Sequence, residues 1–235
     1  MKKLLTILIS VHLIFFSSCE VDVMNPNDLE VRAFWKTEID ARSGVNAIYN
    51  MFYKPGTYNR WIWFRYDLTS DEGFSSSPWL ELADWTRFNY NNYNFWEGNA
   101  WTYRDSYEAI YRANQALFYI PQIEFADENE KNKLLGQAYF LRALHYYNVA
   151  LLWGSENASL AIVLEPSNPG DTPPGNNVTA VWEQVEKDLA NSITMLPGEW
   201  GSEDKGRATK GAAYALRAKA RMQQHKWDEA AEDLE

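Results

Sequence analysis

Apolar side chains recur at helical spacing over the segment 37–53. Four of them follow one another at i, i+3, i+4 and i+7, which places them on one face of a helix: Val45, Ile48, Tyr49 and Phe52. The segment opens with Thr37-Glu38-Ile39-Asp40, which fits a capping box. Pro55-Gly56 follows and cannot continue the helix. The pattern therefore predicts a first amphipathic helix here.

The same periodicity predicts five further helices downstream. They span residues 101–120, 128–153, 179–196 and 209–224, and a last one begins near 227. Three of these helices should end at residues that stop or cap a helix, namely Pro121, Gly154 and Pro197. The stretch 155–177 is rich in Pro and Gly and is predicted as a loop, with one extended piece at 160–164.

The last two predicted helices carry small residues at close-packing positions. Ala213, Leu216 and Ala220 are followed one helix later by Trp227 and Ala230, an arrangement that resembles a tetratricopeptide pair. We therefore predict a mainly α fold of tetratricopeptide-like helical hairpins with long irregular loops. Because the sequence stops inside a helix whose apolar face would lack a partner, we expect this fold to be truncated at the C-terminus.

The N-terminus has the pattern of an export signal. Lys2 and Lys3 precede a mostly apolar run too short to span a bilayer, which needs roughly 20 residues. Small residues then precede Cys19, which resembles the lipobox of bacterial lipoproteins. We predict a signal peptide over 1–18, lipidation of Cys19, a surface tether over 19–36 and the helical region over 37–235. A plain signal peptide with an incidental cysteine is the alternative.

Charge and cysteine count exclude several classes of function. The 235 residues carry a formal net charge of −10, and removal of residues 1–18 leaves 20 basic against 32 acidic side chains. Such a surface repels phosphate backbones, so no nucleic-acid partner is expected. The single cysteine excludes an intramolecular disulfide. The three histidines include no pair at i and i+4, so no metal site is predicted, and no cofactor is expected.

Two buried polar positions are predicted on the helices. His145 falls on the apolar face of the 128–153 helix and is interpreted as a packed core histidine. Arg142 and Arg207 are interpreted as structural, with Asp188 as a candidate partner for a buried guanidinium.

Four stretches match one family in order. They are Tyr107-Glu108-Ala109-Ile110-Tyr111-Arg112-Ala113-Asn114, with Trp101 before it; Gly136-Gln137-Ala138-Tyr139-Phe140-Leu141-Arg142-Ala143-Leu144-His145-Tyr146-Tyr147; Trp182-Glu183-Gln184-Val185-Glu186-Lys187-Asp188-Leu189, with Leu196-Pro197 after it; and Gly206-Arg207-Ala208-Thr209-Lys210-Gly211-Ala212-Ala213. Together with the lipobox they resemble the N-terminal portion of SusD/RagB lipoproteins. Gln137 replaces the family's usual Glu, and Ser155-Glu156-Asn157 replaces its usual Asp-Val-Pro.

The resemblance implies a lipid-anchored protein of the outer membrane, exposed at the cell surface. Members of this family lie on a SusC-type TonB-dependent transporter and deliver oligosaccharides, or in some cases peptides, to it. They bind their ligands and are not enzymes. The family's C-terminal portion, which supplies part of the ligand surface, is missing from this sequence.

Aromatic residues concentrate in one segment without sustained helical periodicity. Residues 58–103 hold 15 of the aromatics, six of the 11 Trp and six Asn. A flat ring can cover the C–H face of a sugar while Asn, Asp or Arg bonds its hydroxyls. An irregular loop on a rigid helical scaffold suits this task. The segment is thus predicted to carry the ligand site.

Within this segment Trp96 and Asn99 are the first candidates for ligand binding. Trp96 would stack on a pyranose, Gly98 would allow close backbone approach, and Asn99 would bond hydroxyls. Further candidates are Trp79, Asp71 and Arg87. The alternative is that the aromatics form a small core for the loop, a role assigned to Trp61, Trp63 and Phe64.

Two other functions remain open from the residues alone. A helical glycoside hydrolase needs two carboxyl groups roughly 5–10 Å apart, and the segment offers several without singling out a pair: Asp71, Glu72, Glu81, Asp84 and Glu97. A helical-repeat adaptor would bind peptide or protein on a concave helical face instead of a loop.

Overall fold

The computed structural model describes residues 31–78, 80–89, 96–168 and 170–235. The chain divides into two units, residues 1–34 and 35–235, and only α2 (Val31–Phe34) is described in the first. The predicted signal peptide and Cys19 lie outside the described residues. In the described part of the chain no helix is long and apolar enough to cross a membrane.

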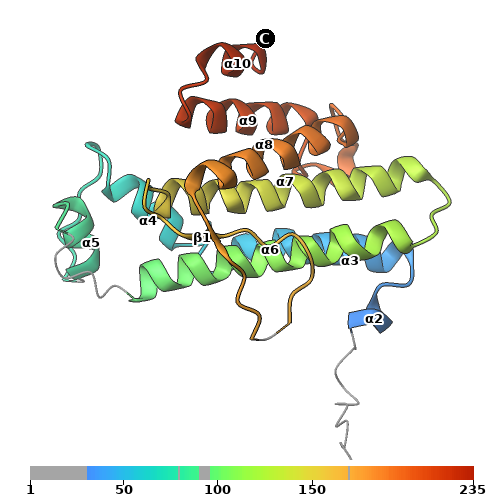
Figure 1. The fold of residues 1–235 in the computed structure, drawn as a ribbon, viewed down its shortest axis with the longest axis horizontal. Helices are drawn as coiled ribbons and strands as arrows, with labels where there is room; N and C mark the ends of the chain where they lie inside the picture. Colours follow the sequence, from blue (N-terminus) through green and yellow to red (C-terminus); the bar gives the residue numbers. More distant parts are fainter. Residues whose placement is uncertain (1–30, 79, 90–95, 169) are drawn as a thin grey trace, which may run out of the picture. The chain divides into compact units, whose positions relative to one another are not determined.

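The second unit is a stack of helices, shown in Figure 1. Its elements are α3 (Glu38–Tyr49), η1 (Asn50–Tyr53), α4 (Trp61–Leu68), α5 (Leu80–Thr86), η2 (Trp96–Ala100), α6 (Trp101–Tyr119), η3 (Ile120–Gln122), α7 (Glu128–Trp153), β1 (Leu160–Ala161), β2 (Gly175–Asn176), α8 (Val178–Met195), η4 (Ser202–Asp204), α9 (Lys210–Gln223) and α10 (Trp227–Glu232). The predicted mainly α class is confirmed, and the helices over 101–120, 128–153, 179–196 and 209–224 match within a few residues.

Side-chain caps fix where the long helices begin. Thr37 and Asp40 form the predicted capping box, in which Asp40 N–H donates to Thr37 Oγ1 and Thr37 N–H donates to Asp40 Oδ2. Asp127, Asn177 and Thr209 likewise accept a backbone N–H at the starts of α7, α8 and α9. Each such cap stabilises its helix by about 1 kcal/mol because it satisfies an otherwise unpaired donor.

Successive helices pack side by side, so that α7 lies between α6 and α8, and α9 covers α8 before α10 (Figure 1). The main core lies among α6, α7, α8 and α9 and includes Val149, Val185 and Leu189. Gly136 lies at a close approach of α7 to α8, because a Cβ there would lie 2.9 Å from Met195 Cβ. This arrangement is the hairpin stack that the sequence predicts.

The periodicity of α6 predicts a buried, largely aromatic stripe, which comprises Tyr103, Tyr107, Ile110, Tyr111, Asn114, Leu117 and Phe118. The structure buries Ile110 and Asn114 as predicted, but the rest of the covered face differs. Tyr111 and Phe118 of that stripe are exposed, whereas Ala109, Ala113 and Ala116 are fully buried. The reason is that α6 is packed against both α3 and α7. Small side chains let two neighbours approach one helix closely, so the large rings turn outward.

The aromatic segment is more ordered than predicted, since it contains α4, α5 and the π-helical turn η2. Trp61 is fully buried, which confirms its assignment to the core, and it meets Trp85 edge to face. The same assignment is wrong for Trp63 and Phe64, which are 52% and 38% exposed. Trp61, Ile62 and Leu68 form the covered face of this short helix, and Trp63 and Phe64 lie outside it.

The predicted buried guanidinium is confirmed. Arg142 on α7 donates from Nε and Nη2 to the two carboxylate oxygens of Asp188 on α8, at 2.8 and 2.7 Å. Gln184 also donates to Asp188, and Asn114 of α6 accepts from Arg142 Nη1 at 2.9 Å. His145 is likewise fully buried, as predicted.

Candidate functional site

Asn99 lies on η2, the π-helical turn that leads directly into α6. Its Oδ1 accepts a hydrogen bond of 2.6 Å from Arg65 Nη1. The preceding residue Gly98 is buried against Trp85, and a Cβ there would lie 2.7 Å from the indole. Glycine is therefore required for η2 to pack this closely on the aromatic core below it, and that packing fixes where Asn99 stands.

Arg65 reaches Asn99 from α4 and also contacts the end of α7. Its Nη2 donates to the Leu152 carbonyl at 3.4 Å, and its guanidinium carbon lies 5.1 Å from the Trp153 ring centroid. Trp153 in turn meets Tyr103 of α6 edge to face, with centroids 5.2 Å apart. Arg65, Asn99, Tyr103 and Trp153, which we call the Asn99 site, thus converge from four separate elements.

The side chains of the Asn99 site are half-buried and complementary in chemistry. The guanidinium supplies several donors in a fixed plane, and the Asn99 amide offers Oδ1 as an acceptor, since its Nδ2 is buried. The two rings supply flat apolar faces with polar edges. Such a set suits a ligand that presents hydroxyls beside C–H faces, and it holds its geometry because each member lies on or next to a helix.

Only part of the predicted site is found in this cluster. Asn99 lies in it, and Trp96 shares its helical turn, although the Trp96 side chain is outside the described residues, as is all of Trp79. Asp71 and Arg87 are exposed, in the turn after α4 and at the end of α5. Within the described part of the chain, neither is hydrogen-bonded to Asn99, whose Oδ1 accepts from Arg65.

Sequence patterns do not single out three members of the Asn99 site. Arg65 stands in the aromatic segment without a distinguishing motif, Tyr103 falls in the stripe of a predicted helix, and Trp153 ends another. The sequence does offer one signal that could have marked Trp153 as a site residue, since it comes just before Gly154, where the predicted helix ends. An aromatic residue at that position lies where the helix gives way to a loop, and is only half covered.

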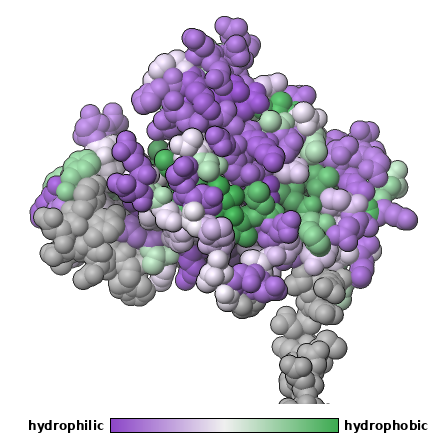
Figure 2. All heavy atoms as spheres, viewed as in Figure 1, coloured by the Kyte–Doolittle hydropathy of each residue, from purple (hydrophilic) through white to green (hydrophobic). Residues whose placement is uncertain are grey.

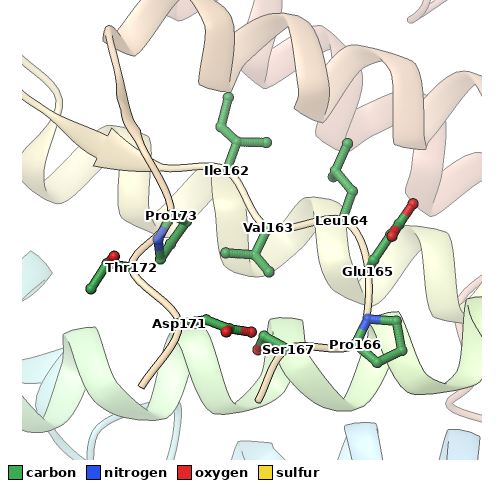
Figure 3. Close-up of a pocket in the computed structure, with 9 residues that line it drawn as sticks. All are labelled: Ile162, Val163, Leu164, Glu165, Pro166, Ser167, Asp171, Thr172 and Pro173. Atoms are coloured by element: carbon green, nitrogen blue, oxygen red, sulfur yellow. The ribbon is translucent and has the colours of Figure 1, made fainter. Parts of the chain in front are cut away.

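A hollow lies in the loop between β1 and β2 and is drawn in Figure 3. Its volume is about 590 Å³, and we call it the hairpin pocket. Its lining comprises Ile162, Val163, Leu164, Glu165, Pro166, Ser167, Asp171, Thr172 and Pro173. Among the residues that the structure describes, no group of three or more His, Cys, Asp or Glu is placed to hold a metal ion.

Stacked helical hairpins that carry a polar and aromatic cluster at one end define a helical protein of tetratricopeptide-like architecture. The family can be named more closely. Residues 21–222 match the SusD-like 3 family, whose description is "Starch-binding associating with outer membrane". The chain therefore belongs to the SusD-like family, which confirms the resemblance seen in its motifs.

Individual relatives agree with this membership. SusD-like protein P38 of Formosa agariphila is 32% identical over 154 residues, which are 64% of this chain and 29% of that protein. SusD-like protein P25 of the same organism is 27% identical over 245 aligned residues, 96% of this chain and 44% of that protein. The chain thus spans less than half the length of these relatives.

Solved structures show the same fold. A SusD-like protein from Bacteroides fragilis superposes with a TM-score of 0.72 at 25% identity, covering 86% of this chain and 38% of its own. A structure described as a "Laminarin binding SusD-like protein" superposes with a TM-score of 0.68 at 27% identity, covering 85% of this chain and 43% of its own. The hairpin stack is therefore a helical portion found within longer SusD-like chains.

Proposed function

We propose that this protein captures oligosaccharides at the Asn99 site and passes them, chemically unchanged, to a SusC-type TonB-dependent transporter. Lipidation of Cys19 would hold it at the outer membrane, with residues 19–36 as the tether. The protein acts in this role as a binder and not as an enzyme.

The observation that carries the proposal is the Arg65–Asn99 pair beside the Trp153 ring. Pairing with Arg65 fixes the Asn99 amide in one orientation. The Asn99 Nδ2 is buried, so the Oδ1, which has a second lone pair, would accept from one ligand hydroxyl while the guanidinium donates to its neighbour. An indole would cover the C–H face of the same sugar. Because both polar side chains are already ordered, little conformational entropy is lost when the ligand binds.

The family description and one relative support glucans as the ligand class to propose. The family description names starch, and one solved relative is named for laminarin. Both are polymers of glucose whose pyranose rings present alternating C–H faces and hydroxyl edges. We therefore take glucan oligosaccharides as the first ligands to test, with peptides as the second class.

The test is isothermal titration of the protein with maltoheptaose and with laminarin oligosaccharides. Asn99→Ala removes the amide and should weaken binding about tenfold, since one or two hydrogen bonds to hydroxyls are lost. Asn157→Ala changes the same residue type in the exposed turn after α7 and should leave the affinity unchanged. Trp96→Ala should weaken binding by a similar or larger factor.

Several results would overturn the assignment. Equal affinity of Asn99→Ala and the unchanged protein, with equal melting temperatures, would exclude the Asn99 site. Release of reducing ends from the oligosaccharide would replace capture by hydrolysis. Labelling with a radioactive fatty acid that persists in Cys19→Ser would remove the proposed anchor.

A further inference from the structure

The chain that leaves β1 is held in place by tyrosine hydroxyls of two helices. Tyr107 of α6 donates to the Ala161 carbonyl at 2.8 Å. Tyr146 of α7 donates to the Val163 carbonyl at 2.8 Å and accepts from the Val163 N–H at 2.7 Å. Burial raises the pKa of Tyr146 to about 12, so this hydroxyl keeps its proton and its donor at neutral pH.

The next residues of this arm are fixed by the buried network on α6 and α7. Asn114 Nδ2 donates to the carbonyls of Val163 and Glu165, at 2.9 and 3.3 Å. Arg142 Nη1 donates to the Leu164 carbonyl at 3.3 Å. The inner arm of the hairpin pocket therefore has its backbone tied to the helical core at four carbonyls between residues 161 and 165.

The outer arm is restrained in a different way. Gly175 pairs with Ala161 in the β1–β2 ladder, and Pro173 and Pro174 precede it. Proline fixes its own φ and restricts the residue before it, so this arm has few alternative conformations. At the tip, Asp171 Oδ2 accepts the Asn168 N–H at 2.6 Å. The pocket between the two arms is thus preformed, which is a property of ligand sites.

The lining of the hairpin pocket combines negative charge with apolar walls. Its ionisable side chains are Glu165 and Asp171, both carboxylates and both exposed. Figure 3 shows the Asp171 carboxylate and the Ser167 hydroxyl directed toward one another across the opening, with Val163 pointing into it. Figure 2 shows hydrophobic atoms gathered on the middle of this face, where the chain leaving β1 crosses the helices.

This chemistry selects among ligand classes. Anions are repelled by the two carboxylates. A sugar ring would find no aromatic face, because the described residues that line the pocket include no aromatic side chain. A bare Ca²⁺ ion needs six to eight oxygens at about 2.3–2.6 Å, a cage that a pocket of about 590 Å³ with two carboxylates among its described lining does not provide. What remains is an organic cation with an apolar stem.

We propose that the hairpin pocket is a second binding site, which takes a lysine side chain of a polypeptide partner. The ammonium group binds at Asp171 and Ser167, and the four methylenes lie against Val163 and Pro173. Lysine side chains bury their stems along apolar surface in this way while the charge keeps a polar partner. The −10 net charge of the chain adds a long-range attraction for basic polypeptides.

This site is separate from the Asn99 site. Tyr107 and Asn114, which hold the inner arm, follow Asn99 by 8 and 15 residues along η2 and α6. At 1.5 Å per helical residue the two sites are roughly 12–22 Å apart along the axis. The two proposals can therefore fail independently.

The experiment is a titration of the ¹⁵N-labelled protein with Nα-acetyl-lysine methylamide, followed by backbone amide shifts. We expect saturable shifts confined to residues 160–176, with a Kd of about 1 mM, as a ligand of this size allows. Nα-acetyl-norleucine methylamide lacks the ammonium group and should give no saturable shift. Equal binding of the norleucine compound, or tighter binding of glucosamine or CaCl₂ at the same amides, would overturn the proposal.

Variants separate the pocket from the general charge of the protein. The double variant Glu165→Gln with Asp171→Asn should raise the Kd for the lysine compound at least tenfold. The amide oxygen introduced at position 171 can still accept the Asn168 N–H, so the tip of the loop should keep its conformation. Glu183→Gln with Glu199→Gln removes the same charge at exposed positions outside the pocket and should leave the Kd within a factor of two. Equal Kd values for the two double variants would refute the site. Maltoheptaose binding should be the same in both.

Discussion

Protonation of His145 should destabilise the protein in mildly acidic solution. The imidazole is fully buried on α7, with the Phe52 ring centroid 6.1 Å away. Among the described residues neither ring nitrogen has a hydrogen-bond partner. Burial alone lowers the pKa of His145 to about 4, because the charged form would lose its hydration without gaining a counterion.

The sign and size of the effect follow from linkage. In the unfolded chain the histidine pKa is about 6.5, so below that pH the unfolded state takes up a proton that the folded state does not. The stability contributed by neutral His145 is complete above pH 6.5, falls as the pH drops, and stops changing below about pH 4. Between pH 7 and pH 5 the loss should be about 2 kcal/mol.

The assay is urea unfolding by circular dichroism at pH 7 and pH 5. His145→Leu keeps a similar volume without titrating, so it should remove about 2 kcal/mol of the difference between the two pH values. It should also be at least as stable as the unchanged protein at pH 7, because two unsatisfied nitrogens disappear. His225→Gln, at an exposed turn, is the control. An equal pH dependence in His145→Leu and the unchanged protein would refute the reasoning.

Two further predictions concern packing and charge. Asp188→Ala should lower the free energy of unfolding, measured in urea, by about 3–5 kcal/mol, because it leaves the Arg142 guanidinium buried without its carboxylate. A decrease below about 1 kcal/mol would contradict this. Gly98→Ala should cost about 1–3 kcal/mol, since its Cβ would lie 2.7 Å from the Trp85 indole. Gly211→Ala, whose Cβ would meet nothing closer than 3.9 Å, should not lower the melting temperature.

The long helices could be predicted from the sequence because their determinants are local. The two residues of the capping box, Thr37 and Asp40, are three positions apart. The apolar stripes of α7 and α8 likewise repeat every three or four residues. The face that α6 buries could not be predicted in the same way. Helical periodicity places Tyr111 and Phe118 on one stripe, but only the positions of α3 and α7 decide that the alanine face is the covered one.

The Asn99 site could be predicted only in part for a related reason. Asn99 and Trp96 are recognisable because they stand together in an aromatic segment. Their companions are distant in sequence: Arg65 precedes Asn99 by 34 residues. Trp153 is contributed by the end of α7, and the sequence pattern predicts no helix where α4 lies. Short helices of this kind have weak periodicity, and tertiary contacts decide whether they form.

Buried polar residues connect the fold to the hairpin pocket. The bidentate Arg142–Asp188 pair adds little net stability over a well-packed apolar pair, because desolvation offsets most of the attraction. The Nη1 of Arg142, however, donates to Asn114 and to the Leu164 carbonyl, and so orders one arm of the hairpin pocket. Replacing both partners, as in Arg142→Met with Asp188→Leu, should therefore retain the fold while loosening the pocket. Proteolysis at residues 162–173 that stayed as slow as in the unchanged protein would show that the tyrosine and Asn114 contacts hold this arm without Arg142.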